Sequence, residues 1–326
     1  MHDVARAAGV SIKTVSRVVN GSDQVALDTR DRVLSAVATL GYVRDPIAHS
    51  LRTGSSDTIG IIIDSIADRF FSLVASEVEE RALARGISVL IASTGRSPER
   101  ELGQVSRLLQ QNIDALVLAP NLGDHRYLRD GAGHLPIVLI DRGWELPGYD
   151  TVRVEDREGA KAATTHLVAY GHRRIGFLGE DDQLETITAR RLGYFDGLQD
   201  SGIDVDPALM APGCSTAAEA NLATRALLDS PAPPTAIFAS NPRVAMGVVS
   251  ALHHTHRLDV ALVSFGDFDL ADSVFPAVTV IEQDPRQIAQ AAVDRAFARM
   301  AKEDLIPTDI TLPVELIARG SGELSP

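Results

Sequence analysis

The chain has 326 residues, 45% of them hydrophobic and 23% charged, so it can bury a sizeable core and is long enough for two or three domains. A single cysteine, Cys214, excludes an internal disulfide, and no apolar run approaches the roughly 18 residues that span a bilayer. The net charge of -13 is uneven, because residues 1–54 carry seven basic and five acidic side chains whereas residues 55–326 carry 24 and 39, so only the N-terminal end is suited to contact phosphates.

The first twenty residues, MHDVARAAGVSIKTVSRVVN, contain two helical bursts of apolar and small side chains that are separated at Gly9. This pattern predicts two short helices around a tight turn, the helix-turn-helix arrangement that presents its second helix to the DNA major groove. The spacing i, i+3, i+4 turns Val15, Val18 and Val19 of the second helix toward a small core.

The other face of this second helix is polar. Ser11 precedes the helix and can cap it through its hydroxyl. Ile12 lies at its N-terminus, where side chains reach deepest into the groove. The side chains that can read base edges or hold phosphates are Lys13, Thr14, Ser16, Arg17 and Asn20. The periodicity alone also fits an ordinary solvated face on a small helical bundle.

A third helix is predicted over residues 28–40, since Val33, Leu34 and Val37 share one face and Gly41 follows it. The segment RDPIAHSLRT comes next, and Gly54-Ser55-Ser56 then breaks the rhythm of the chain. We therefore expect a three-helix unit over residues 1–43, a hinge or linker over 44–56 and a large body over 57–326.

In the body, short β-branched runs alternate with helical stretches. Buried parallel strands are predicted at 58–63, 87–91, 115–118, 137–140, 174–178, 236–239 and 261–265. Helices are predicted at 70–85, 99–110, 124–132, 189–201, 217–228 and 243–253. Alternating strands and helices imply parallel sheets covered on both faces, and two such series imply two lobes with a ligand crevice at the carboxyl ends of their strands.

The segment DVARAAGVSIKTVSRVVNG resembles the signature of the lactose/galactose repressor family of bacterial transcription regulators. The resemblance continues through TRDRVLSAVATLGY and IAHSLRTG, and it resumes in the body at IGIIIDSIADRFF, HLVAYGHRRIGFLG and VTVIEQD. It therefore covers essentially the whole chain. It implies an α/β protein in which a three-helix helix-turn-helix headpiece precedes a two-lobed, doubly wound, periplasmic-binding-protein-like (type I) domain.

The resemblance also implies how the protein works. A homodimer would bind double-stranded operator DNA of pseudo-palindromic sequence, each head taking one half-site. The hinge, including Ala48 and Leu51, would fold into a helix on the operator, and the leucine would wedge into the minor groove. The first lobe would comprise about 57–153 and 285–305, and the second about 154–284 and 306–326.

Carried over by motif, the expected effector-binding residues are Phe70, Phe71, Arg190, Asn241, Asp267 and Gln283. Arginine, asparagine and aspartate side chains suit a hydroxyl-rich small molecule, a sugar or a sugar phosphate. Three alternatives stay open: Phe70 as lobe core, Arg190 as a surface partner of Glu185, and Asp156 as a helix cap rather than a ligand-binding residue.

Several positions depart from the family pattern. Met1 begins almost inside the first helix, without the usual capping threonine, and Ala26 replaces the serine that usually caps the third. In the body, Pro242 and Gly266 replace aspartates that the family often has. Cys214 stands where many members place a stacking aromatic, and Trp144 is either a substitute platform or a loop anchor.

Other classes of protein fit less well. The sequence contains no nucleophile elbow, P-loop or dinucleotide-binding glycine motif, so we expect neither an enzyme nor a cofactor. His253, His254 and His256 lack the acidic spacing of a metal site. The N-terminus is no secretory signal, which disfavours an exported solute-binding protein and favours the cytoplasm. The predicted function is a repressor of carbohydrate uptake or catabolism genes. The alternatives are a regulator that responds to a purine, a nucleoside or another effector, and a solute-binding protein of the exported type with a vestigial DNA-binding head.

Overall fold

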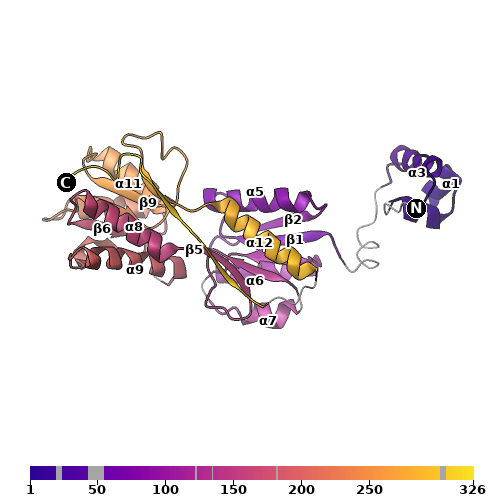
Figure 1. The fold of residues 1–326 in the computed structure, drawn as a ribbon, viewed down its shortest axis with the longest axis horizontal. Coiled ribbons are helices and arrows are strands. Elements are labelled where there is room, and N and C mark those ends of the chain that lie inside the picture. The colour runs from indigo at the N-terminus through magenta and orange to yellow at the C-terminus, as the bar shows by residue number, and fades with distance from the viewer. Residues whose placement is uncertain (20–23, 43–54, 122, 134, 181–182, 302–305) are drawn as a thin grey trace. The chain divides into compact units, whose positions relative to one another are not determined.

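The computed structural model describes residues 1–19, 24–42, 55–121, 123–133, 135–180, 183–301 and 306–326 (Figure 1). The chain divides into two compact units, residues 1–56 and 57–326, which are described separately. Three of the predicted DNA-contacting residues, Asn20, Ala48 and Leu51, lie outside the described residues.

The N-terminal unit contains α1 (His2–Ala8), α2 (Ile12–Val19) and α3 (Leu27–Thr39), close to the expected helices. Its core consists of Val4, Ala5, Ala8, Val15, Val18, Val33 and Ala36. Gly9 ends α1 in the left-handed conformation at φ 63°, which costs glycine little because it has no Cβ. No side chain caps α1 at Met1 or α3 at Ala26, as the two departures from the family pattern predict.

The first lobe of the body is a parallel sheet in the order β11-β5-β4-β3-β1-β2. Its strands are β1 (Thr58–Ile63), β2 (Ser88–Ser93), β3 (Ala115–Leu118), β4 (Ile137–Ile140), β5 (Asp150–Val154) and β11 (Asp309–Leu312). Its helices are α5 (Arg69–Leu83), α6 (Pro98–Gln110), α7 (Arg126–Ala132) and α12 (Pro285–Met300). Helices α5 and α12 cover one face of the sheet and α6 and α7 the other (Figure 1).

The second lobe has the order β12-β10-β9-β8-β6-β7, with β12 antiparallel to β10 and the other pairs parallel. Its strands are β6 (Ile175–Leu178), β7 (Met210–Ala211), β8 (Ala236–Ala239), β9 (Ala261–Phe265), β10 (Thr279–Glu282) and β12 (Glu315–Ile317). Its helices are α8 (Asp156–Ala169), α9 (Glu185–Asp200), α10 (Ala217–Leu228) and α11 (Pro242–His254), with a 3-10 turn at Pro207–Leu209. Both lobes thus have the α/β architecture expected from the sequence.

The C-terminal lobe boundary differs from the expected one. The expected boundary places the whole segment 306–326 in the second lobe, but β11 pairs in parallel with β5 of the first lobe. Ile310 and Leu312 pack against the first lobe's core, and Arg153 of β5 lies 2.9 Å from Asp309. The chain therefore enters the second lobe only after Leu312, because these apolar side chains find their partners beside β5.

Helix α8 is absent from the predicted elements, because the face that it buries is made of small residues rather than large apolar ones. Gly159, Ala160, Ala163 and Thr164 belong to this face. It packs closely on α9, where a Cβ added to Gly193 would lie 2.1 Å from the Arg157 carbonyl oxygen. Small residues on both helices bring their backbones together, which a search for large apolar stripes does not detect.

Candidate ligand cleft and nucleic-acid interface

Helix α2 presents a basic face to solvent. Ser11 Oγ accepts a hydrogen bond from the Thr14 amide at 3.1 Å and thus caps the helix as predicted. Val15 and Val18 are buried against α1 and α3, whereas Ile12, Lys13 and Arg17 are exposed and Thr14 and Ser16 are half-buried. The helix contains no acidic residue, so this face offers hydrogen-bond donors and positive charge to an anionic partner.

A cleft lies between the two lobes, where the carboxyl ends of their strands meet. Five of the six residues predicted to bind a ligand line it: Phe70, Phe71, Arg190, Asn241 and Gln283. The cavity that they enclose has a volume of only about 50 Å³.

Arg190 lies in the centre of the second lobe's side of this cleft. Its Nε donates to Asp156 Oδ1 at 2.7 Å and its Nη1 to the Ser240 carbonyl oxygen at 2.8 Å. The guanidinium carbon lies 3.8 Å from the centroid of the Phe265 ring. The side chain is therefore buried and is not a surface partner of Glu185, whose carboxylate instead accepts from the Gly143 amide at 2.6 Å.

Asp156 is the first residue of α8, yet it does not cap the helix. It is 2% exposed, and its Oδ2 has no hydrogen-bond partner among the described residues. Burial raises the pKa of its carboxyl to about 6, although Arg190 favours the charged form. Ser240 Oγ and Gln283 Oε1 are also buried without a partner in the described part of the chain. Buried polar atoms normally have partners, and of these three residues only Gln283 lines the cavity, so its Oε1 is the oxygen that a ligand there could reach.

The other residues predicted to bind an effector also have structural roles in the lobes. Asn241 caps α11, because its Oδ1 accepts from the Val244 amide at 2.9 Å, and it also lines the cavity. The rings of Phe70 and Phe71 lie 5.1 Å apart in the first lobe's core and reach the cavity from there. Asp267 is not brought into the central cavity, since both of its oxygens accept from Arg319, at 2.9 and 3.0 Å. It borders a neighbouring groove with Phe70 and Gln283.

Cys214 and Trp144, which were considered above as possible ligand contacts, do not line the central cavity. Cys214 is buried in the second lobe's core, and its Sγ lies 3.5 Å from the Ala211 carbonyl oxygen. The Trp144 ring stacks on the guanidinium of Arg153 at 5.1 Å, so it anchors its loop.

Known proteins resemble the chain along its full length. Residues 1–45 match the family model described as bacterial regulatory proteins, lacI family, and residues 164–322 match a periplasmic binding protein-like domain. The transcriptional regulator GalS of Salmonella typhimurium is 33% identical, and the match covers 98% of this chain and 96% of GalS. The chain belongs to the lacI family.

Other members support this assignment. The transcriptional repressor CytR of Escherichia coli is 30% identical over 100% of this chain and 97% of its own. A crystal structure of the lac repressor dimer, bound to operator and the anti-inducer ONPF, has a TM-score of 0.88 at 28% identity and covers 99% of this chain and 98% of that one. As a member of the lacI family, this protein is a DNA-binding transcription regulator and not an enzyme, as the sequence led us to expect.

Sequence reasoning missed the charged residues of the cleft. They are Asp64, Asp68, Arg96, Asp141, Arg142, Glu180 and Arg243. Arg142 is buried and donates to Asp64 and to the Pro120 carbonyl oxygen. Four of them, Asp64, Asp141, Arg142 and Glu180, stand within two residues of the end of a strand, and this position was the signal that could have found them.

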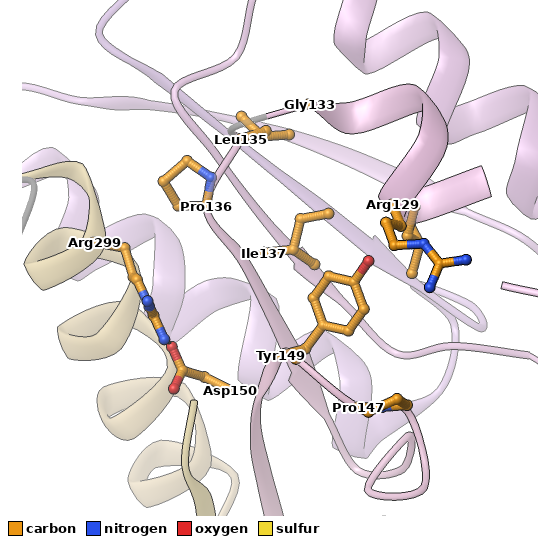
Figure 2. A pocket seen from close by; sticks show the side chains of 11 residues that line it. Arg129, Gly133, Leu135, Pro136, Ile137, Pro147, Tyr149, Asp150 and Arg299 are labelled. Carbon is orange, nitrogen blue, oxygen red and sulfur yellow. The ribbon is translucent and has the colours of Figure 1, made fainter. Parts of the chain in front are cut away.

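A second and larger cavity, of about 430 Å³, lies at the amino ends of β4 and β5 (Figure 2). Arg299 and Asp150 lie side by side on its wall, with Arg299 Nε donating to Asp150 Oδ2 at 2.8 Å. Among its described lining residues, no buried side-chain atom lacks a partner. The cleft between the lobes is therefore the better ligand site.

Over the described residues, no helix is long and apolar enough to cross a membrane. The same residues include no group of three or more His, Cys, Asp or Glu side chains that could hold a metal ion.

Proposed function

We propose that this regulator represses transcription as a homodimer on a pseudo-palindromic operator and that a neutral sugar in the cleft switches it. The observation that carries the ligand class is Gln283 Oε1, a buried oxygen that lines the cavity and has no partner in the described part of the chain. A sugar hydroxyl can donate to it, and Asn241 on the same wall also suits a hydroxyl-rich ligand.

A neutral sugar fits this site better than a sugar phosphate. Arg96, Arg142, Arg190 and Arg243 all face the cavity, but each already donates to a carboxylate of the protein. A phosphate would have to compete with these carboxylates, and it would bring acceptors to Gln283 Oε1, which needs a donor. The cavity is lined by side chains of both lobes, so a ligand bound there can change how the lobes pack on each other, and that coupling makes a switch possible.

The proposed operator contacts come from α2 and the hinge. Ser11, Ile12, Lys13, Thr14, Ser16 and Arg17 occupy the exposed side or the start of α2, and Asn20, Ala48 and Leu51 complete the set by family resemblance. Support for a dimeric operator complex comes from the lac repressor, whose structure is a dimer bound to operator.

A dimer surface is available on the first lobe. Strand β2 is the last strand of its sheet, and Leu90 and Ile91 on it are 38% and 39% exposed. An exposed apolar edge strand invites pairing with another chain, and a second copy would cover it. We propose that β2 forms part of the homodimer interface, with residues 1–43 as the DNA-binding head, 44–56 as the hinge and 57–326 as the effector-binding body.

Calorimetric titration with a panel of pentoses, hexoses, disaccharides, sugar phosphates and nucleosides tests the ligand class. We expect a neutral sugar to bind the wild-type protein and to lose affinity in Arg190→Met. A nucleoside or a sugar phosphate as the only ligand would contradict the proposal. A gel-shift selection from a palindromic operator library tests the proposed operator binding independently. Absence of specific, salt-sensitive binding would contradict that part of the proposal.

A further inference from the structure

Five charged residues connect the two lobes across the mouth of the cleft. Asp64, Asp68 and Arg96 belong to the first lobe, and Glu180 and Arg243 to the second. We refer to these five residues as the inter-lobe latch. Three of them, Arg96, Glu180 and Arg243, lie outside the motifs that carry the family resemblance, so the resemblance does not predict the latch.

Glu180 is the centre of the latch. Its Oε2 accepts from Arg96 Nη1 of the opposite lobe, and its Oε1 accepts from Arg243 Nη1 at 2.9 Å. Arg96 also donates from Nε to Asp64 Oδ2 at 3.1 Å, and Arg243 Nη2 lies 3.3 Å from Asp68 Oδ2. One arginine from each lobe therefore donates to the carboxylate of Glu180. Two of these contacts, Arg96 with Glu180 and Arg243 with Asp68, join the first lobe to the second.

Burial makes these contacts strong. The side chain of Glu180 is 2% exposed and that of Asp64 is 1% exposed. A buried carboxylate is tolerated only while its cationic partners stay in place, because removing one leaves an uncompensated charge away from water. A further ion pair between the lobes, Arg69 with Asp269 at 3.0 Å, is largely exposed and contributes little.

The latch also occupies the ligand cleft. All five of its residues line the small central cavity. A ligand in this cavity therefore lies against the charged groups that join the lobes.

We propose that the inter-lobe latch holds the two lobes together, and that Glu180 is the residue that sets how readily they separate. Since its residues line the cleft, a ligand that pairs with them changes the balance between joined and separated lobes. This inference concerns the conformation of the free protein, and it stands whether or not the cleft binds a sugar.

Gly143 provides a direct readout of opening. Its amide, in the first lobe, donates to Glu185 Oε2 of the second lobe at 2.6 Å. When the lobes separate, this amide loses its partner and exchanges its hydrogen with solvent. The only tryptophan, Trp144, is the next residue, so its fluorescence reports on the same loop.

The test compares the ligand-free full-length protein with Glu180→Gln and Arg96→Gln, by hydrogen exchange at Gly143 and by X-ray scattering in solution. Asp196→Asn is the matched control, since Asp196 pairs with Arg157 within the second lobe at 2.6 Å. We expect exchange at Gly143 to accelerate about tenfold or more in both latch variants, with a larger radius of gyration and shifted Trp144 emission, and no change in the control.

Two results would overturn the inference. One is a folded Glu180→Gln or Arg96→Gln protein whose Gly143 exchange and radius of gyration match the wild type. The other is an equal change in Asp196→Asn, which would mean that removing any paired carboxylate loosens the body. If Glu180→Gln does not fold, Arg96→Gln decides alone, because Arg96 is 30% exposed and tolerates substitution better. Sugar titration is a separate experiment, so its failure would bear on the proposed function and not on the latch.

Discussion

Arg190 Nε lies 2.7 Å from Asp156 Oδ1, and this pair connects the first turns of α9 to the start of α8 beneath the ligand cleft. The arginine is fully engaged by Asp156, the Ser240 carbonyl and the Phe265 ring. The aspartate keeps one oxygen, Oδ2, without a partner in the described part of the chain. The pair thus fixes the position of Arg190, which lines the cavity, and leaves one buried oxygen of Asp156 behind it.

The first prediction concerns the proton on Asp156. Burial raises the pKa of this carboxyl from 3.8 to about 6, so between these values the folded protein holds a proton that the unfolded chain has lost. The residue's contribution to the free energy of unfolding therefore falls as the pH rises through this window. Relative to Asp156→Asn, we expect wild-type stability to fall by about 2 kcal/mol from about pH 4 to about pH 7. Urea unfolding at a series of pH values measures this, and a constant difference would contradict it.

The second prediction concerns Arg190. Arg190→Met leaves Asp156 and the Ser240 carbonyl without their donor, and we expect the free energy of unfolding to fall by about 3–5 kcal/mol. Arg190→Lys should recover little of this, since an ammonium cannot bridge the same partners and stack on Phe265. Arg191→Met, on the neighbouring half-buried residue, is the control and should cost less than about 1 kcal/mol in chemical denaturation.

The third prediction separates two glycines within helices. In Gly193→Ala the new methyl group would lie 2.1 Å from the Arg157 carbonyl oxygen, so α9 must move away from α8. We expect a loss of about 1–3 kcal/mol or more, together with weaker ligand binding as Arg190 shifts. Gly103→Ala in α6 meets nothing within 4 Å, and it should instead stabilise the protein by about 0.5–1 kcal/mol. Similar melting temperatures for the two variants would refute this contrast.

The fourth prediction concerns the uncapped third helix. Ala26 precedes α3 with φ -55° and ψ 141°, a backbone conformation that a capping residue adopts, but it has no side-chain oxygen. Ala26→Ser should therefore stabilise the N-terminal unit by about 1 kcal/mol. Circular dichroism of the full chain would show a higher melting temperature for its headpiece transition, and Ala26→Val should show no such gain.

The fifth prediction concerns the proposed operator contacts. Lys13→Ala and Arg17→Ala remove exposed charges from α2 without touching its core. Each should weaken operator binding and make the slope of log K against log salt shallower by about 0.9 for every phosphate that the variant no longer neutralises. Arg173→Ala, on the second lobe, is the charge-matched control. An unchanged affinity in both α2 variants, measured by fluorescence anisotropy, would exclude this face from the interface.

Local sequence determined much of the fold. The strands β1, β3, β4, β8 and β9 match their predicted ranges, because continuous runs such as Thr58–Ile63 are buried on both faces of a parallel sheet. The headpiece helices follow from the valine spacing, and Ser11 caps α2 as its chemistry suggests. Helix α8 and strand β11 could not be found this way, since one buries small residues and the other is defined by its neighbour β5.

The amino-acid sequence by itself determined the class of protein, the parallel lobes and the arginine at the centre of the site, because these depend on local periodicity and on motifs. Only the tertiary structure decided which side chains meet. In the folded protein, Arg190 pairs with Asp156, and Arg96 of the first lobe pairs with Glu180 of the second. Asp267 pairs with Arg319 and lies outside the central cavity. Any carboxylate close to an arginine can form an ion pair with it, so the local sequence does not select the partner. Arg96 and Glu180 are 84 positions apart in the chain, and they come close together only when both sheets have packed.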